Sequence, residues 1–144
     1  MQKTDGFKLK RFVEAQRKTY PKILAELKNG LKLTDWMCFV FPQCEGLGKS
    51  RIAKEFAIKS LEEARQYLDH PVLGSRLLEC TQTVLALNGR SAHDIFDSPD
   101  DQGLQSCMTL FNAISEPASI FQQVLDRYFN GEQDALTLWM LEGK

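Results

Sequence analysis

The sequence lacks the features of a membrane protein or a secreted protein. Its longest strictly apolar run is six residues, from Trp36 to Phe41, whereas a helix that spans a bilayer needs roughly 20. The first residues, MQKTDGFKLKRF, contain no apolar signal-peptide core, and no Asn-x-Ser/Thr site is present. We therefore expect a soluble, cytoplasmic protein with no membrane partner.

Metal-binding patterns are also scarce. The chain has only two histidines, His70 and His93, and no pair of cysteines with Cys-x-x-Cys spacing, so we expect no metal site and no cofactor. Scattered cysteines without a secretion signal are typical of a reducing compartment. Each cysteine is either a buried thiol, the commoner case, or a candidate nucleophile. The four are Cys38, Cys44, Cys80 and Cys107.

Net charge is small, but it is unevenly distributed. The formal charge is −1 overall, divided into +6 over residues 1–33 and −7 over residues 34–144. The basic segment can meet an anionic partner, pair with the acidic remainder of its own fold, or form a solvated helix face. Because aromatic residues are sparse in this segment, nucleic acid is a less favoured partner than an anionic small molecule or a protein.

Helix start and stop signals recur along the whole chain. Apolar residues repeat at helical spacing from Leu9 to Tyr20, and Gln16 is the one polar member of that stripe. Pro21 fits either a first helical turn or a kink. Further starts are marked by a Ser-x-x-Glu capping box at Ser60, by Ser91, by Ser98-Pro99, by Pro117 and by Asp134.

Two segments are harder to assign. The apolar run 36–41 fits a short buried strand or a buried helix; its neighbours have helical patterns and a lone strand has no partner, so we predict a helix that ends before Pro42. Ile52, Phe56 and Ile58 predict another short helix. With 43% hydrophobic and 26% charged residues, residues 1–144 are predicted to form one compact all-α domain of about seven or eight short helices.

The stretch FPQCEGLGKS at 41–50 ends in the Gly-Lys-Ser of a phosphate-binding loop. Such a loop needs its first glycine at position 43, which holds Gln43, and Gly46 is too close to replace it. No alternation of strands and helices surrounds it. We therefore interpret the stretch as a tight turn before a helix. Lys49 beside the exposed N–H groups of that helix leaves an anion site as a second interpretation.

Three blocks of the sequence carry a resemblance to a known family. WMCFVFPQCEGLGKS, AIKSLEEARQYLDHPVLGSRLLECT and SPDDQGLQSCMTLF resemble the bacterial family of domain of unknown function 1810 over almost the whole chain, roughly residues 7–141. The resemblance implies a mainly helical single domain and no particular activity. Members often carry the label calpastatin, but calpastatin inhibitory segments are disordered before binding, whereas this composition predicts a packed globule.

The chain departs from the family pattern at three positions. Cys38 stands where the family has a second tryptophan, Asp35 where it often has histidine, and Gly103 where it often has lysine. Chemistry that relatives perform with that histidine or lysine is therefore not implied for this chain.

Two classes of function remain open. One is a non-enzymatic binding or interaction domain; the other is a small-molecule enzyme acting on an anionic or nucleotide-like ligand near the 43–50 turn. For the enzyme, His70 needs Asp101 or Ser106 nearby, but a place at a helix start suffices to explain His70 and Asp101 and is the favoured interpretation. Convergence in one pocket favours the enzyme, and dispersal favours the interaction domain. The candidate ligand-binding residues are Trp36, Gln43, Gly46, Gly48, Lys49, Ser50, His70, Arg76, Asp101 and Ser106.

Overall fold

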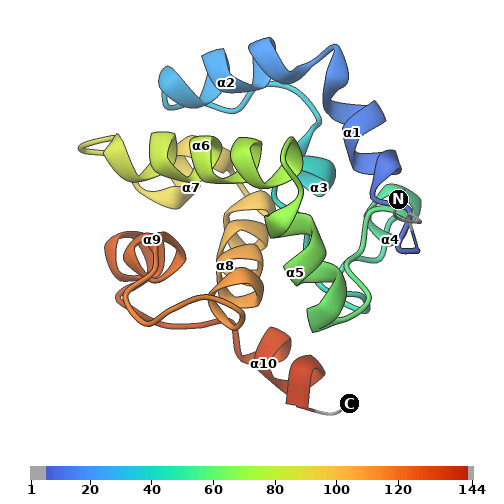
Figure 1. Cartoon of the computed structure of the whole chain (residues 1–144). Coiled ribbons are helices and arrows are strands. Elements are labelled where there is room, and N and C mark those ends of the chain that lie inside the picture. The colour runs from blue at the N-terminus through green and yellow to red at the C-terminus, as the bar shows by residue number, and fades with distance from the viewer. Residues whose placement is uncertain (1–5, 143–144) are drawn as a thin grey trace.

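A computed structural model describes residues 6–142 of the chain. This range folds into one compact all-helical domain, as predicted, with ten helices and no named strand (Figure 1). The number exceeds the predicted seven or eight because several helices are single turns. The helices are α1 (Lys10–Arg17), α2 (Tyr20–Lys28), α3 (Met37–Val40), α4 (Arg51–Glu55), α5 (Leu61–Asp69), α6 (Leu73–Ala86), α7 (Ala92–Phe96), α8 (Asp100–Asn112), α9 (Ile120–Phe129) and α10 (Ala135–Glu142).

The apolar stripe that begins at Leu9 is divided between two helices. α1 ends at Arg17, and α2 begins at Tyr20 with Pro21 in its first turn. Proline is tolerated there because the first N–H groups of a helix have no intrahelical partner. Gln16, the polar member of the stripe, is buried with Phe12.

The apolar run 36–41 is helical, as predicted, and α3 ends at Val40, before Pro42. The prediction for Ile58 was wrong, because α4 ends at Glu55 and Ile58 lies in an extended segment. There Ile58 forms an isolated parallel bridge with Cys44. The Glu45 N–H donates to the Ile58 carbonyl at 2.8 Å, and the Ile58 N–H donates to the Gln43 carbonyl at 2.9 Å.

Most of the predicted helix starts are confirmed by their hydrogen bonds. Ser50, Ser60 and Ser91 each accept a backbone N–H at the start of their helices, and Asp134 accepts the Thr137 N–H. Two details differ. The Glu63 carboxylate binds the Lys59 N–H rather than that of Ser60, so the predicted box is only half formed. α9 begins at Ile120 with Ser119 as its cap, three residues after Pro117.

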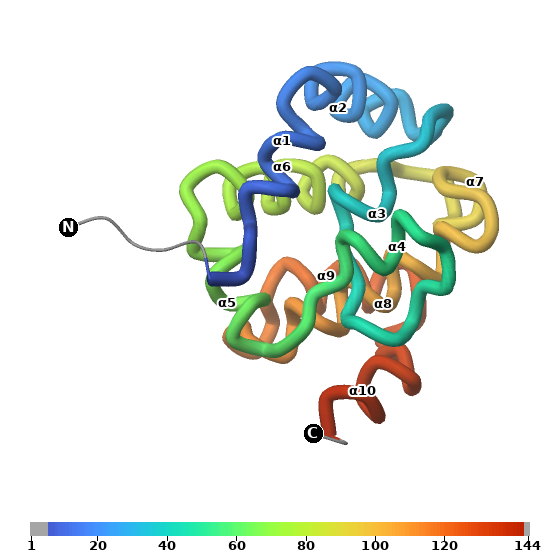
Figure 2. Tube along the Cα trace, turned by 90° about the vertical axis from the view of Figure 1, so that its right-hand side faces the viewer, coloured from blue at the N-terminus to red at the C-terminus, as the bar shows by residue number. Residues whose placement is uncertain are grey.

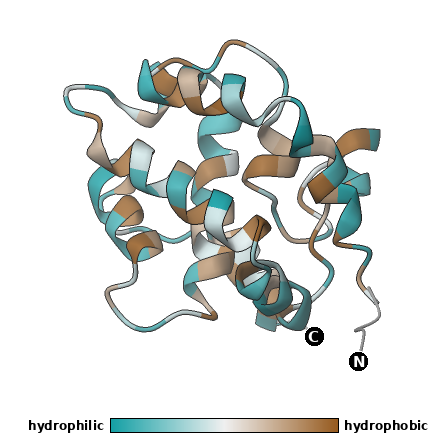
Figure 3. Ribbon diagram, turned by 45° about the horizontal axis from the view of Figure 1, so that its top comes forward, coloured by the Kyte–Doolittle hydropathy of each residue, from teal (hydrophilic) through white to brown (hydrophobic). Residues whose placement is uncertain are grey.

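α8 forms the centre of the molecule. Eight of its 13 residues are buried, and it packs against α5, α7, α9 and α10. Figure 1 shows α8 between these helices, with α2 and α6 above it. In Figure 3 most helices carry both hydrophobic and hydrophilic residues, as expected where one face lies on a shared core.

α10 lies at the edge of the molecule. Figures 1 and 2 both show it below α8, with the rest of the chain on one side of it. The four cysteines all lie within the described residues, and none forms a disulfide. Within residues 6–142, no helix combines the length and apolar character needed to cross a bilayer.

Candidate functional site

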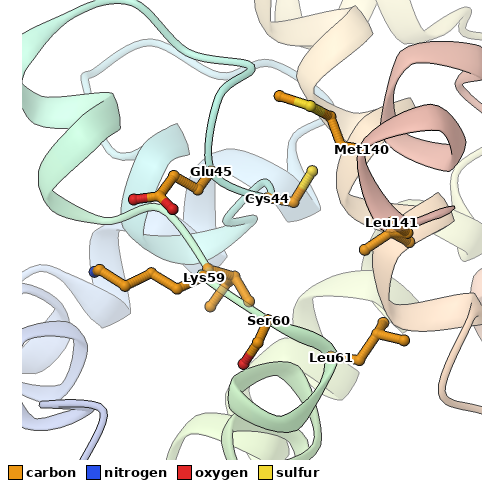
Figure 4. Close-up of a pocket in the computed structure, with 8 residues that line it drawn as sticks. Cys44, Glu45, Lys59, Ser60, Leu61, Met140 and Leu141 are labelled. Carbon is orange, nitrogen blue, oxygen red and sulfur yellow. The ribbon is translucent and has the colours of Figure 1, made fainter. Parts of the chain in front are cut away.

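An apolar pocket of about 260 Å³ separates α10 from the extended segments that carry Cys44 and Ile58. Figure 4 shows Cys44 and Leu61 facing Met140 and Leu141 of α10 across this space. The pocket is therefore formed by segments from the middle and the end of the chain. Its lining residues are Cys44, Glu45, Ile58, Lys59, Ser60, Leu61, Met140 and Leu141.

The polar residues of the lining contribute little to its interior. The charged ends of Glu45 and Lys59 extend away from α10 in Figure 4. The Ser60 hydroxyl accepts the Glu63 N–H at 3.1 Å as a helix cap. Aliphatic carbon and sulfur consequently dominate the surface that a ligand would meet, which suits an apolar group.

α10 exposes two large apolar side chains while its fully buried position holds a polar residue. Its buried residue is the polar Thr137, whereas Leu136 and Trp139 are 53% and 67% exposed. Met140, one turn after Leu136, lines the pocket. Because residues four apart share a helix face, the exposed apolar surface of α10 continues into the pocket.

Two polar contacts hold the start of α10 in place. The Asp134 N–H donates to the Thr109 hydroxyl of α8 at 2.8 Å. The Asp134 carboxylate in turn accepts the Thr137 N–H at 2.9 Å and the Thr137 hydroxyl at 2.6 Å. These bonds explain why a threonine occupies the buried face, and they position Met140 and Leu141 one turn further along.

The predicted turn adjoins this pocket. Gly46 has a φ of +100°, and a Cβ added to it would lie 2.0 Å from the Met140 Cε. Gly48 does not have a positive φ; instead, a Cβ there would lie 2.4 Å from that of Ala53. Ser50 caps α4 through the Ala53 N–H at 3.0 Å, and Lys49 is exposed. The turn thus has a structural basis at each position except Lys49.

Trp36 and Gln43 lie on the inner side of the same region. Trp36 is buried, and its indole N–H donates to the Glu26 carboxylate at 2.8 Å. Gln43 is partly buried, and its amide nitrogen lies 3.1 Å from the point that a Cβ on Gly103 would occupy. Glycine at position 103 therefore leaves room for the Gln43 side chain.

His70 and Arg76 have structural partners in or beside α6. The His70 Nδ1 accepts the N–H groups of Val72 and Leu73 at 3.1 and 3.2 Å, so the side chain caps the start of α6. Arg76 donates to the Gln16 side chain at 3.3 Å and lies over the Tyr20 ring at 4.8 Å. Its partners are thus an amide and an aromatic ring of the same fold.

Asp101 contacts the other histidine of the chain. Its Oδ2 lies 3.4 Å from the His93 Nδ1, and the Ser98 hydroxyl lies 3.3 Å from the same nitrogen. In a Ser-His-Asp triad, serine and aspartate contact opposite nitrogens of the imidazole, so this trio is not arranged as a triad. His93 is moreover 61% exposed. The pattern Ser98–Asp101 had suggested only a helix start.

The predicted residues therefore occupy separate places in the fold. The 43–50 turn lies beside the pocket, whereas His70, Arg76 and Asp101 belong to other local networks, and Ser106 is buried in α8. Within residues 6–142, no group of three or more His, Cys, Asp or Glu side chains is arranged to hold a metal ion. Leu61, Met140 and Leu141 line the pocket but were not among the predicted site residues, although the almost wholly apolar stretch ALTLWML of α10 indicated an apolar surface there.

The fold is a small all-helical domain with an apolar pocket beside α10. Residues 6–141 match the model of the family described as "Protein of unknown function (DUF1810)", and the chain belongs to this family. A similar solved structure is that of the conserved hypothetical protein Rv1873 from Mycobacterium tuberculosis. It is 46% identical over 96% of this chain and 99% of that chain, with a TM-score of 0.94. No curated protein matches.

Proposed function

We propose that this protein is a non-enzymatic interaction domain that binds its partner with α10 and the pocket beneath it. The observation that carries the proposal is the exposure of Leu136 and Trp139 on α10, beside a pocket that Met140 and Leu141 of the same helix line. Single exposed apolar residues are ordinary on protein surfaces. Exposed apolar side chains that continue into an apolar pocket are a recognised feature of binding surfaces.

The size of the pocket favours a single side chain as its occupant. At about 260 Å³, it is smaller than the roughly 300–1,000 Å³ of pockets that enclose drug-sized molecules. One large apolar side chain of a protein partner fits such a volume, while the rest of the partner contacts Leu136 and Trp139. Aromatic and aliphatic anchors of this kind provide most of the binding energy in many interfaces.

The alternative, an enzyme acting on an anionic or nucleotide-like ligand, has less support. Its candidate groups at His70, Arg76 and Asp101 bind different neighbours. Among the described residues that line the pocket, the one hydroxyl is that of Ser60, which accepts the Glu63 N–H as a helix cap and does not contact a general base there. Lys49, the remaining anion-binding candidate, lies in the 43–50 turn, before a helix of only five residues.

A titration with N-acetyltryptophanamide, a neutral indole compound, tests the proposal. We expect it to shift the backbone NMR signals of Cys44, Ile58, Leu61 and Met140 selectively, because these residues line the pocket. Inorganic phosphate is the matched anionic probe. Shifts with phosphate around Lys49, together with no response to the indole up to millimolar concentration, would support the alternative and contradict the proposal.

A variant that fills the pocket provides the control. Leu61→Trp places a larger side chain at the pocket wall and should abolish the indole response. Leu33→Ala removes an exposed leucine from the segment between α2 and α3 and should leave the response unchanged, since Leu33 does not line the pocket. Circular dichroism and thermal unfolding of both variants establish that each is folded. Equal indole binding by folded Leu61→Trp would place the site elsewhere.

A further inference from the structure

We propose that the partner at this site is a second copy of the chain, and that each copy inserts its Trp139 into the pocket of the other. This inference rests on the proposed function and names the partner. The two complementary parts, an exposed indole and an apolar pocket, are both present on one molecule. Trp139 directly precedes Met140 and Leu141, which line the pocket, so both parts lie at the same end of α10.

The side chain and the pocket have matching chemistry. Trp139 is 67% exposed, whereas the other tryptophan, Trp36, is 3% exposed and fixed in the core. An indole buries on the order of 150–250 Å² when enclosed. The Cys44 and Met140 side chains place sulfur at the pocket wall (Figure 4), and sulfur contacts aromatic rings favourably.

Symmetry allows both exchanges to occur at once. When a surface patch carries both a projecting group and its own receptor, a two-fold axis pairs each with its counterpart and closes the assembly at two copies. Leu136 lies one turn before Met140 and three residues before Trp139, so it extends the same patch. The two α10 helices would then pack against each other beside the exchanged indoles.

Electrostatics does not oppose this pairing at the pocket. The lining contains one acidic and one basic side chain, Glu45 and Lys59, and both extend away from α10 (Figure 4). Two identical pocket walls therefore approach without net like-charge repulsion from their lining residues.

The contact area predicts a weak association. Leu136 and Trp139 from two copies bury on the order of a few hundred Å² of apolar surface, whereas stable interfaces bury roughly 1,200–2,000 Å² in total. The dimer should accordingly form in a concentration-dependent manner, with a dissociation constant of about micromolar or weaker.

Sedimentation velocity between about 1 μM and about 1 mM protein tests the proposal. We expect the wild-type protein to shift from monomer to dimer across this range, and Trp139→Ala to remain monomeric. Leu33→Ala, which removes another highly exposed apolar side chain, should dimerise like the wild type. A wild-type protein that stays monomeric, or a Trp139→Ala variant that dimerises equally, would overturn the proposal.

A mixing experiment separates indole exchange from simple stacking of two Trp139 side chains. Trp139→Ala retains an open pocket, and Leu61→Trp retains Trp139 but fills its own pocket. Neither should self-associate, whereas an equimolar mixture should form heterodimers through the one remaining indole–pocket contact. Weaker association than the wild type is expected, because half of the exchange is lost. No association in the mixture, with both variants folded, contradicts the exchange.

The same variants distinguish failure of this inference from failure of the proposed function. N-acetyltryptophanamide is titrated into Trp139→Ala, whose pocket has no competing indole. If the compound binds at the pocket but the wild-type protein forms no dimer, the proposal of an interaction domain stands and a second copy is rejected as its partner. No binding and no dimer would reject both.

Discussion

The Glu26 carboxylate, 6% exposed, accepts a hydrogen bond from the indole N–H of Trp36 at 2.8 Å. The same carboxylate accepts the N–H groups of Leu33 and Thr34 and the Thr34 hydroxyl. One buried side chain of α2 therefore fixes the segment that leads into α3. Burial raises the pKa of Glu26, but these hydrogen bonds outweigh it and lower the pKa from 4.5 to about 2.

Stability should therefore depend on pH through Glu26. Because the folded pKa lies below the unfolded one, the stabilisation is complete above about pH 4.5 and is lost as the pH falls toward 2. The shift corresponds to about 3 kcal/mol. We expect Glu26→Gln to lower the free energy of unfolding by about 2–3 kcal/mol at pH 7, and by less at pH 3. Urea unfolding at both pH values measures this, and exposed Glu116→Gln is the control; a loss independent of pH would contradict the assignment.

Loss of the Arg11 side chain should lower the stability of the fold strongly, because Arg11 pairs with a second buried carboxylate. Glu63 is fully buried and pairs with Arg11 at 3.0 Å, and Arg11 also donates to the carbonyl oxygens of Glu55 and Ala57. Arg11→Ala leaves the Glu63 charge without its partner and should cost about 3–5 kcal/mol. Arg17→Ala, which breaks an exposed pair with Glu14, should cost less than about 1 kcal/mol.

A double-mutant cycle checks the origin of the Arg11 effect. Arg11→Ala in a Glu63→Gln background should cost measurably less than in the wild type, because no buried charge is left unpaired. Equal costs in the two backgrounds would assign the loss to the backbone carbonyl contacts of Arg11 instead.

Substitutions in the turn before α4 should differ in how much they lower the stability of the fold. Ser50→Ala removes the hydrogen bond to the Ala53 N–H and should lower the free energy of unfolding by about 1 kcal/mol. Gly48→Val should cost more, because of the close approach to Ala53 rather than because of a positive φ. Lys49→Ala should change stability by less than about 0.5 kcal/mol. Thermal and urea unfolding measure all three, and a large loss in Lys49→Ala would reveal a structural role that the geometry does not indicate.

The cysteines should differ in reactivity. Burial raises the pKa of Cys80 to about 12 and that of Cys107 well above its usual value. Burial also raises the pKa of Cys38, but Cys38 is only half-buried. A thiol reagent at pH 8 should therefore modify Cys38 before Cys80 and Cys107 in the folded protein, and four thiols after unfolding without reductant. Cys38→Ser should lower by one the number of thiols modified before Cys80 and Cys107, and an unchanged number in this variant would contradict the order.

Local rules explain why much of the fold was predictable. Ser50, Ser60 and Ser91 cap their helices through N–H groups three residues away, so the sequence carries both partners of each bond. The helix at 36–41 followed from its helical neighbours and from Pro42. Ile58 was assigned wrongly because its bridge partner, Cys44, lies far from it in the sequence, and no local signal reports such a pairing.

The arrangement of the candidate site depended on tertiary packing more than the positions of the helices did. The sequence alone determined an all-helical domain, its helix starts, the 43–50 turn and the apolar character of α10, because caps, proline and 3.6-residue periodicity act within a few residues. Only the tertiary structure decided that Asp101 meets His93 rather than His70, that Glu63 pairs with Arg11, and that Met140 closes a pocket over Cys44. These contacts join residues from separate elements of the fold, and their geometry is set by how the whole core packs around α8.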